Sequence, residues 1–373
     1  MARQSSGTNI GVSIWLATLL LGPVVQVRGV DAAAQPTPSL IETNGSFHIP
    51  AQDWPLKPGP REITVHVRYP GSLPHLRKVR PTTGLMLSLH NWGGTGFVGT
   101  ADPAFLADTY DVVVIGVDYL QSGRQASIED PEPYDFGWLQ ALDALRALHF
   151  VFDGLIQQGI PFDRARLFTT GGSGGGNVSL MANKLAPRTF AAVIDLCGMK
   201  KLSDDIAFNL PGGSELNARY VRNPGHAFYL SPDAQELRFL GHPKHLAIMN
   251  QLGCTASIIT VHGVDDRTCP DVDEYATNLT ASGLSFTHVP VTRERIDGRI
   301  FTSTGHALGD RTLIVEQVAG RFLNAHSPQA LRRSGLTDFE RREEIRYPTS
   351  QGVWVVNYER GYPVGRFDGR PQP

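Results

Sequence analysis

Short runs of apolar residues recur along the chain and predict strands. Residues 62–69 alternate between polar and apolar positions, as in a strand with one exposed face. Residues 84–90 and 111–118 are mostly apolar, which is typical of strands buried on both faces of a parallel sheet. Further runs of this kind cover 166–170, 191–196, 257–262 and 285–291.

Helical periodicity separates these runs. In residues 136–158, Trp138, Leu142 and Leu145 fall on one helical face. Further helices are predicted over 178–185, 271–282 and 308–324. Strands that alternate with helices predict an α/β fold with a doubly wound, mostly parallel sheet.

Three stretches interrupt this alternation. Residues 35–60 are rich in proline and polar residues and predict a linker into a domain over 61–326. Residues 200–251 carry few strand signals, and a connection of about 50 residues predicts a lid-like insertion. Residues 327–373 predict a C-terminal appendage, because "GVWVVNYERGYPVGRF" reads as a short hairpin with Gly361 at its turn.

The first 34 residues have the pattern of a signal peptide. Arg3 precedes an uncharged, mostly apolar run over 10–27, and three alanines at 32–34 form a small-residue cleavage site. A run of this length could also anchor the chain in a membrane. Pro23 and the alanines favour cleavage, so we expect a secreted or periplasmic protein without membrane attachment.

Composition narrows the expected partners. The 373 residues are 41% hydrophobic and carry a net charge of −2, which does not favour nucleic acid or an anionic membrane as a partner. The three cysteines, Cys197, Cys254 and Cys269, leave at least one thiol unpaired within the chain. Cys254 and Cys269 could form a disulfide, although buried free thiols are equally compatible with the sequence. The composition does not predict an oligomeric state.

The glycine-rich stretch "FTTGGSGGGN" at 168–177 surrounds a single serine. It does not match a phosphate-binding P-loop, because no lysine follows the glycines, and Asn177 occupies the last position of a dinucleotide-binding GxGxxG. Residues 171–175 do match GxSxG between a predicted strand and a predicted helix. This context predicts a sharp turn that exposes the hydroxyl of Ser173 as a nucleophile.

A serine nucleophile needs a base and an acid that orients the base. "GVDDRTCP" follows the strand at 257–262, and "TSTGHALGD" follows the strand at 285–291. His306 would take the proton of Ser173 and deliver it to the leaving group. Asp265 is the favoured acid and the adjacent Asp266 is the alternative.

Two backbone amides are expected to bind the oxyanion. One is that of Gly174 at the helix start, and the other is that of Trp92 or Asn91 in "LSLHNWGGTG". His90 and His262 end strands and are expected to be structural. His242 and His245 resemble a metal-binding pair only loosely, and without a third ligand we expect no metal and no cofactor.

The stretches LHNWGGTG, TTGGSGGGN, VHGVDDRTCP and TGHALGD together resemble the α/β-hydrolase superfamily, in particular its prolyl-oligopeptidase-like and secreted-esterase branches, over about residues 61–324. "HGVDDRTCP" is similar to the HGxxDDxVP loop of that branch, which implies that its first aspartate, Asp265, is the acid. Residues 173–220 also resemble a little-characterised bacterial hydrolase family of unknown function. The sequence departs from these relatives in two ways: it shows no N-terminal β-propeller, and HNWGG replaces the lipase HGGG.

These observations predict an exported serine hydrolase that cleaves a small-molecule or carbohydrate ester through an acyl-enzyme. An ester is favoured over a peptide because no propeller is seen and the insertion can form only a modest lid. The alternatives are an oligopeptidase-type serine peptidase and an envelope protein that keeps the fold for binding. The binding role is disfavoured, since it would not need serine, histidine and aspartate together.

Overall fold

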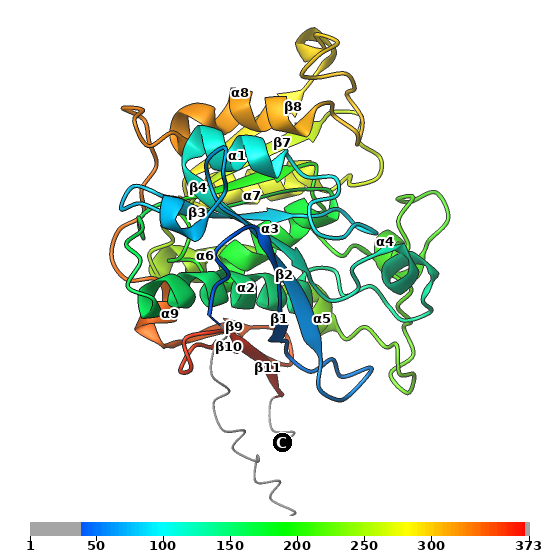
Figure 1. The fold of residues 1–373 in the computed structure, drawn as a ribbon. Helices are drawn as coiled ribbons and strands as arrows, with labels where there is room; N and C mark the ends of the chain where they lie inside the picture. Colours follow the sequence, from blue (N-terminus) through cyan, green and yellow to red (C-terminus); the bar gives the residue numbers. More distant parts are fainter. Residues whose placement is uncertain (1–38, 370–373) are drawn as a thin grey trace, which may run out of the picture. The chain divides into compact units, whose positions relative to one another are not determined.

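Eight strands form one sheet whose spatial order differs from their order in the sequence (Figure 1). The computed structural model describes residues 39–369. The order is β1-β2-β4-β3-β5-β6-β7-β8, in which β1 and β2 are antiparallel to their neighbours and β3 to β8 are parallel. This is the strand order of the α/β-hydrolase fold, so the predicted fold is confirmed. The strands are β1 (Gly45–Pro50), β2 (Glu62–Arg68), β3 (Gly84–Leu89), β4 (Val112–Asp118), β5 (Leu167–Gly172), β6 (Ala192–Leu196), β7 (Ser257–Gly263) and β8 (Phe286–Val291).

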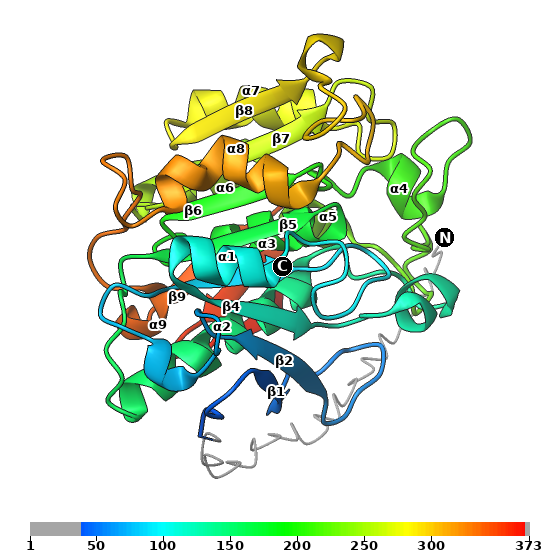
Figure 2. The same ribbon diagram turned by 45° about the horizontal axis from the view of Figure 1, so that its top comes forward.

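Helices cover both faces of the sheet and create two hydrophobic cores. On one face lie α1 (Pro103–Tyr110) and α8 (Arg311–Leu323), which stand in front of the sheet in Figure 2. On the other face lie α2 (Trp138–Gln157), α3 (Gly174–Leu185), α6 (Pro243–Gln251) and α7 (Val272–Ser282). Alternate strand residues divide between the cores: Met86 joins the first and its neighbours Leu85 and Leu87 the second. Short helical turns lie at η1 (Leu76–Lys78), η2 (Gln125–Glu129) and η3 (Arg293–Arg295).

The linker predicted over 35–60 is wrong in its central part. Residues 45–50 form β1, which pairs with β2 along its whole length. Phe47 and Ile49 are buried while Ser46 and His48 are exposed, so the strand has only two inward apolar residues. So short an alternation between proline-rich flanks gives a weak signal, and pairing with β2 decides the structure. Helix α1 was not predicted either.

The insertion predicted over 200–251 has few regular elements. It contains α4 (Asp204–Phe208) and α5 (Pro232–Leu237), and α4 stands at the right of Figures 1 and 2, beyond the layered helices. Its apolar residues form a third cluster that includes Leu202, Ile206 and Leu230. The last helix of the range, α6, instead contributes Leu246 and Met249 to the main core.

The C-terminal appendage is a three-stranded antiparallel sheet, one strand more than the predicted hairpin. Its strands are β9 (Glu344–Pro348), β10 (Gly352–Asn357) and β11 (Val364–Gly369), preceded by α9 (Asp338–Arg341). Gly361 lies in the β10–β11 turn with a φ of 87°, a value that favours glycine. The sheet lies at the bottom of Figure 1, and Trp354 of β10 packs edge-on against Trp138 of α2.

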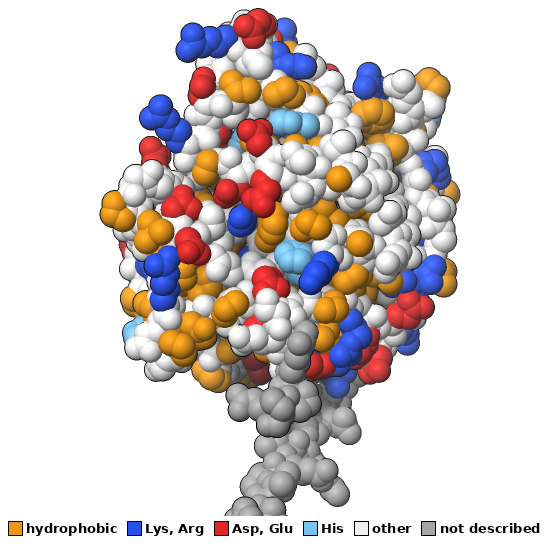
Figure 3. Space-filling view, turned by 180° about the vertical axis from the view of Figure 1, so that it is seen from behind, with side chains coloured by type: hydrophobic (Ala, Val, Ile, Leu, Met, Phe, Trp, Pro, Cys, Tyr) orange, Lys and Arg blue, Asp and Glu red, His pale blue; other side chains and the backbone are white. Residues whose placement is uncertain are grey.

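One face of the molecule mixes side chains of all types. On the face seen in Figure 3, acidic and basic residues are interspersed with hydrophobic ones. Within residues 39–369, no helix has both the length and the apolar character that crossing a bilayer requires. The predicted signal peptide, at residues 1–34, lies outside the described residues.

Candidate active site

Ser173 is the single point at which a long buried stretch of chain reaches solvent. Every residue from 166 to 200 is buried except Ser173, which is partly exposed. It connects β5 to α3 at the carboxyl end of the sheet, the edge at which α/β proteins place their ligands. The structure thus places Ser173 where the sequence predicted an exposed nucleophile.

The backbone at Ser173 makes the sharp turn that the glycine pattern predicts. Its φ of 55° is unusual for a non-glycine residue, and its N–H donates to the carbonyl of Leu196 at 2.8 Å. A side chain at Gly171 would lie 2.4 Å from the backbone of Gly175, and one at Gly175 would lie 2.0 Å from the carbonyl oxygen of Leu89. The GxSxG glycines are therefore needed because strand, turn and helix touch one another directly.

His306 lies between Ser173 and an aspartate. Its Nε2 is 2.9 Å from Ser173 Oγ, and its Nδ1 is 2.9 Å from Oδ2 of Asp266. A carboxylate can only accept a hydrogen bond, so Nδ1 carries the proton and Nε2 is free to accept the serine proton. The arrangement is the hydrogen-bonded Ser-His-Asp chain that serine hydrolases use.

The acid that contacts His306 is Asp266, so the preference for Asp265 is wrong. The chain turns inward after β7, because the N–H of Asp266 donates to the carbonyl of Gly263. Asp265 is left at the surface, where its carboxylate accepts from Thr304 Oγ1 at 2.7 Å and its N–H donates to the Thr304 carbonyl. Asp265 therefore ties the acid loop to the loop that carries His306.

Asp266 is held as a buried, ionised acceptor. Its Oδ1 accepts from the amides of Thr268 and Cys269, and its Oδ2 also lies 3.2 Å from Nε2 of His262. Burial by itself would raise the pKa of Asp266, but the hydrogen bonds from His262 and His306 outweigh burial and hold that pKa well below its ordinary value. A permanent negative charge in this position stabilises a protonated His306.

Several backbone amides near Ser173 donate to no acceptor within residues 39–369, and two of these amides are the best-placed oxyanion donors. They belong to Gly174, at the start of α3, and to Trp92, after β3. A Cβ on Gly174 would lie 2.6 Å from the nitrogen of Trp92, so the two loops are in close contact. This approach favours Trp92 over Asn91 as the second oxyanion donor. A helix N-terminus adds a favourable field for negative charge at the same point.

The loop that carries Trp92 is fixed on several sides. The ring nitrogens of His90 lie 2.8 Å from the carbonyl oxygen of Asn91 and 2.7 Å from Ser122 Oγ, so His90 is structural, as predicted. Burial lowers the pKa of His90 to about 4, which keeps the ring neutral. The Trp92 ring stacks on Tyr134 with centroids 3.8 Å apart.

The side chain of Cys197 lies against the loop that carries His306, and the sequence did not predict this contact. Cys197, the residue after β6, has a φ of 47° and donates its thiol hydrogen to the carbonyl of His306 at 3.0 Å. All three cysteines are free thiols, so no disulfide joins Cys254 to Cys269. Nothing in the local sequence of Cys197 indicates its position, because β6, β5 and the His306 loop meet only in the folded sheet.

Apolar side chains of the insertion lie next to the oxyanion loop. The third hydrophobic cluster includes Tyr134 and Met199, and several partly buried residues pack on it. These partly buried residues are Trp92, Phe208, Leu216, Tyr220 and Ala234. The insertion is linked to this loop through Ser127, whose carbonyl accepts from both Trp92 Nε1 and Arg219 Nη2.

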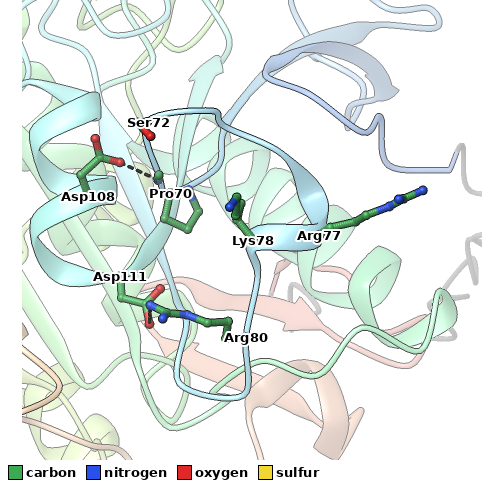
Figure 4. Close-up of a pocket in the computed structure, with 8 residues that line it drawn as sticks. Pro70, Ser72, Arg77, Lys78, Arg80, Asp108 and Asp111 are labelled. Atoms are coloured by element: carbon green, nitrogen blue, oxygen red, sulfur yellow. Dashed lines mark hydrogen bonds and ion pairs between the residues drawn. The ribbon is translucent and has the colours of Figure 1, made fainter.

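A separate surface pocket lies at the opposite edge of the main sheet (Figure 4). Arg80 and Asp111 come just before β3 and β4, and they form an ion pair of 3.1 Å in its wall. Asp108 accepts from the amide of Gly71. No triad residue lines this pocket, so it takes no part in the chemistry of Ser173.

Comparison with known proteins identifies a family without assigning an activity. The sequence profile of the DUF2920 family, described as proteins of unknown function, matches residues 129–360, which is more than half of the chain. No curated protein sequence matches the chain.

Several solved structures are similar in fold at low identity. An acylaminoacyl peptidase from Pyrococcus horikoshii aligns with a TM-score of 0.49 and 13% identity over 75% of this chain and 41% of that one. A dipeptidyl peptidase 4 from Porphyromonas gingivalis gives 0.47 and 14% over 75% and 35%. A puromycin-hydrolyzing peptidase from Mycobacterium tuberculosis gives 0.49 and 16% over 77% and 41%. The chain therefore spans about two-fifths of the length of these proteins.

Proposed function

Since the chain belongs to the DUF2920 family, whose function is unknown, we propose from its own site that it is a serine hydrolase that cleaves carboxylic esters with an apolar acyl group. The observation that carries the proposal is the continuous contact from Asp266 through His306 to Ser173, with 2.9 Å at each step. It ends at the one residue of a long buried stretch that reaches solvent.

Acylation would begin with transfer of the Ser173 hydroxyl proton to His306 Nε2 as Oγ attacks the ester carbonyl carbon. The carbonyl oxygen becomes negative and would accept hydrogen bonds from the amides of Gly174 and Trp92. Neither amide would have to give up an existing hydrogen bond to do so. His306 would then give its proton to the alcohol oxygen as the carbon–oxygen bond breaks. The products of this half are the alcohol and an acyl-Ser173 enzyme.

Deacylation would reverse the roles with water as the nucleophile. His306 takes a proton from the water, the hydroxide oxygen attacks the acyl carbon, and the same two amides bind the negative oxygen. The collapse returns the proton to Ser173 Oγ and releases the carboxylic acid. Asp266 stabilises the protonated imidazole in both halves without itself taking up a proton.

The proposed preference for an apolar acyl group rests on the apolar side chains beside the oxyanion amides. Trp92 supplies both an oxyanion donor and a half-buried indole, and Leu216 and Tyr220 of the insertion pack on the same cluster. An apolar acyl chain would bury area against these side chains, at about 25 cal/mol for each Å² removed from water. Charged acyl groups would gain nothing there.

Export remains a proposal that rests on the signal-like residues 1–34.

The test has two parts. A fluorophosphonate probe is expected to label the purified protein at Ser173, mapped by peptide mass spectrometry, and not to label the His306→Ala variant. Next, p-nitrophenyl acetate, butyrate and octanoate are compared with alanine and proline nitroanilides. Faster turnover of the esters supports the proposal. Turnover of the anilides alone would replace it with a peptidase, and neither labelling nor turnover in folded protein would favour a binding role.

A further inference from the structure

One group of potential metal ligands stands out within residues 39–369, and it lies at the triad itself. Cys197 Sγ, a carboxylate oxygen of Asp266 and a ring nitrogen of His306 lie within 4.8 Å of one another. Thiolate sulfur, imidazole nitrogen and carboxylate oxygen are the three donor types that Zn²⁺ takes in proteins. Two of these residues belong to the acyl-transfer machinery, and Cys197 has no part in that chemistry.

We propose that these three side chains form an inhibitory site for a borderline or soft divalent cation, with Zn²⁺ as the physiological example. Ligand atoms about 2.0–2.3 Å from a tetrahedral zinc lie roughly 3.3–3.8 Å from each other. The present spacing therefore needs shifts of about an ångström or less from the three side chains. His306 is 25% exposed, which gives the cation a path, and water can take the fourth ligand position.

The backbone aims the thiol at this position. Cys197 has a left-handed φ of 47°, and its N–H is held by the carbonyl of Val261 at 2.8 Å. A φ of this kind is unfavourable for a non-glycine residue. The thiol of Cys197 is held against the His306 loop by its contact with the His306 carbonyl.

Binding exchanges a proton for the metal. The Cys197 thiol releases its proton to solvent as the metal–sulfur bond forms, and its hydrogen bond to the His306 carbonyl is lost. The proton on Nδ1 of His306, the ring nitrogen beside Asp266, moves to Nε2 as Nδ1 binds the metal. The resulting thiolate and the Asp266 carboxylate carry two negative charges, which match the charge of the cation. Burial raises the pKa of Cys197 to about 12, so the metal must displace a firmly held proton. The charges of Arg311 and Asp195 both reach the Cys197 thiol. A cation bound there would therefore be repelled by Arg311 and attracted by Asp195.

The functional consequence rests on the proposed hydrolase. A metal-bound ring nitrogen cannot take part in the relay from Ser173 through His306 to Asp266, so the site would be blocked until the metal leaves. Binding itself does not depend on turnover, so it can be measured even if the proposed activity is wrong.

The experiment is therefore a direct binding measurement in the Ser173→Ala variant, which keeps the three ligands. Co²⁺ is used as a spectroscopic substitute for Zn²⁺, because a cobalt–thiolate bond absorbs in the near ultraviolet and bonds to nitrogen or oxygen do not. The band is expected on titration with Co²⁺, to be lost when Zn²⁺ competes, and to be absent in Ser173→Ala/Cys197→Ser. The matched control is Ser173→Ala/Cys254→Ala, which should keep the band, since Cys254 lies outside the group.

Absence of the band in Ser173→Ala, or its persistence after Cys197→Ser in protein with an unchanged circular dichroism spectrum, overturns the proposal. If Cys197→Ser does not fold, the Co²⁺ titration is repeated on Ser173→Ala/Asp266→Asn, in which the band must weaken. Ester hydrolysis gives the second readout. Zn²⁺ should inhibit the wild type reversibly with EDTA and Mg²⁺ should not, and Cys197→Ser should raise the inhibitory Zn²⁺ concentration at least tenfold. Equal Zn²⁺ inhibition in the two proteins would also overturn it.

Discussion

The backbone groups at the two ends of helix α3 differ in whether they have hydrogen-bond partners. At its N-terminus the amide of Gly174 has no acceptor in the described chain, and the preceding Ser173 is strained and partly exposed. At its C-terminus the carbonyls of Lys184 and Leu185 accept from the buried hydroxyls of Tyr347 and Tyr358, which belong to the C-terminal appendage. Both ends of a helix leave backbone groups without intrahelical partners.

The difference shows what each end is for. The appendage satisfies the C-terminal carbonyls, and a second buried contact joins it to the loop after α3: Asp338 accepts from Arg188 and Thr189. The N-terminal end keeps its donors free for a negative oxygen. One end therefore stabilises the fold and the other keeps unsatisfied groups for chemistry. Substitutions at the two ends should separate activity from stability.

The largest effect is expected at the N-terminal end. Ser173→Ala should lower kcat for the best ester by on the order of 10³-fold or more, because the nucleophile, base and acid act as one unit. The melting temperature should not fall, since the residue makes few contacts and alanine keeps the turn. Steady-state kinetics and thermal unfolding on the same preparation measure both. Residual activity near that of wild type would remove Ser173 from the proposed mechanism.

The acid loop provides the next contrast. Asp266→Asn should lower kcat by roughly 10³–10⁴-fold, because an amide facing Nδ1 favours the wrong tautomer of His306. Asp265→Asn is the matched control one residue away, and it removes a surface charge while the amide oxygen can still accept from Thr304. We expect less than about a tenfold effect for that control. Comparable kcat values for the two variants would contradict the assignment of Asp266.

At the other end, Asp338→Asn should lower the free energy of unfolding without altering the active site. It breaks a buried pair with Arg188, whose Nε lies 2.7 Å from Oδ1, and breaking such a pair costs on the order of 3–5 kcal/mol. Glu343→Gln is the control, because Glu343 contacts the same arginine but is half exposed, and about 1 kcal/mol or less is expected. Urea unfolding gives the free energies. A loss of kcat per folded molecule in Asp338→Asn would show that the ends of α3 are coupled.

The smallest effect concerns acid stability. His245 of α6 is buried, its Nε2 lies 3.0 Å from the Pro348 carbonyl of β9, and burial lowers its pKa to about 2. The folded state keeps His245 neutral while the unfolded state protonates near pH 6.5, so this residue contributes no pH dependence above that value. As the pH falls below it, stability is lost at up to about 1.4 kcal/mol per pH unit.

His245→Asn should therefore flatten the fall in unfolding free energy between pH 6.5 and 4, measured by urea titration at each pH. His48→Asn, at an exposed position in β1, serves as the control for the histidine-to-asparagine change itself. An unchanged slope in His245→Asn would mean that other groups dominate the acid transition.

Most of the main sheet could be read from the sequence, because its signals are local. Seven of the eight strands are apolar or alternating runs whose burial follows directly from their pattern, and helix α2 follows from its periodicity. β1 could not be read in this way, since two inward residues gain their meaning only from pairing with β2. β9 was missed for the same reason, because it is a strand only beside β10.

By itself the sequence determined the fold class and two members of the candidate triad, Ser173 and His306. Glycines around one serine define a turn that few other residues allow, and the order of the elements places the histidine loop at the same sheet edge. Only the tertiary structure decided between Asp265 and Asp266, and only it placed Cys197 beneath His306. Those outcomes depend on the direction in which one side chain points after a turn, which the packing of distant loops sets and local pattern does not encode.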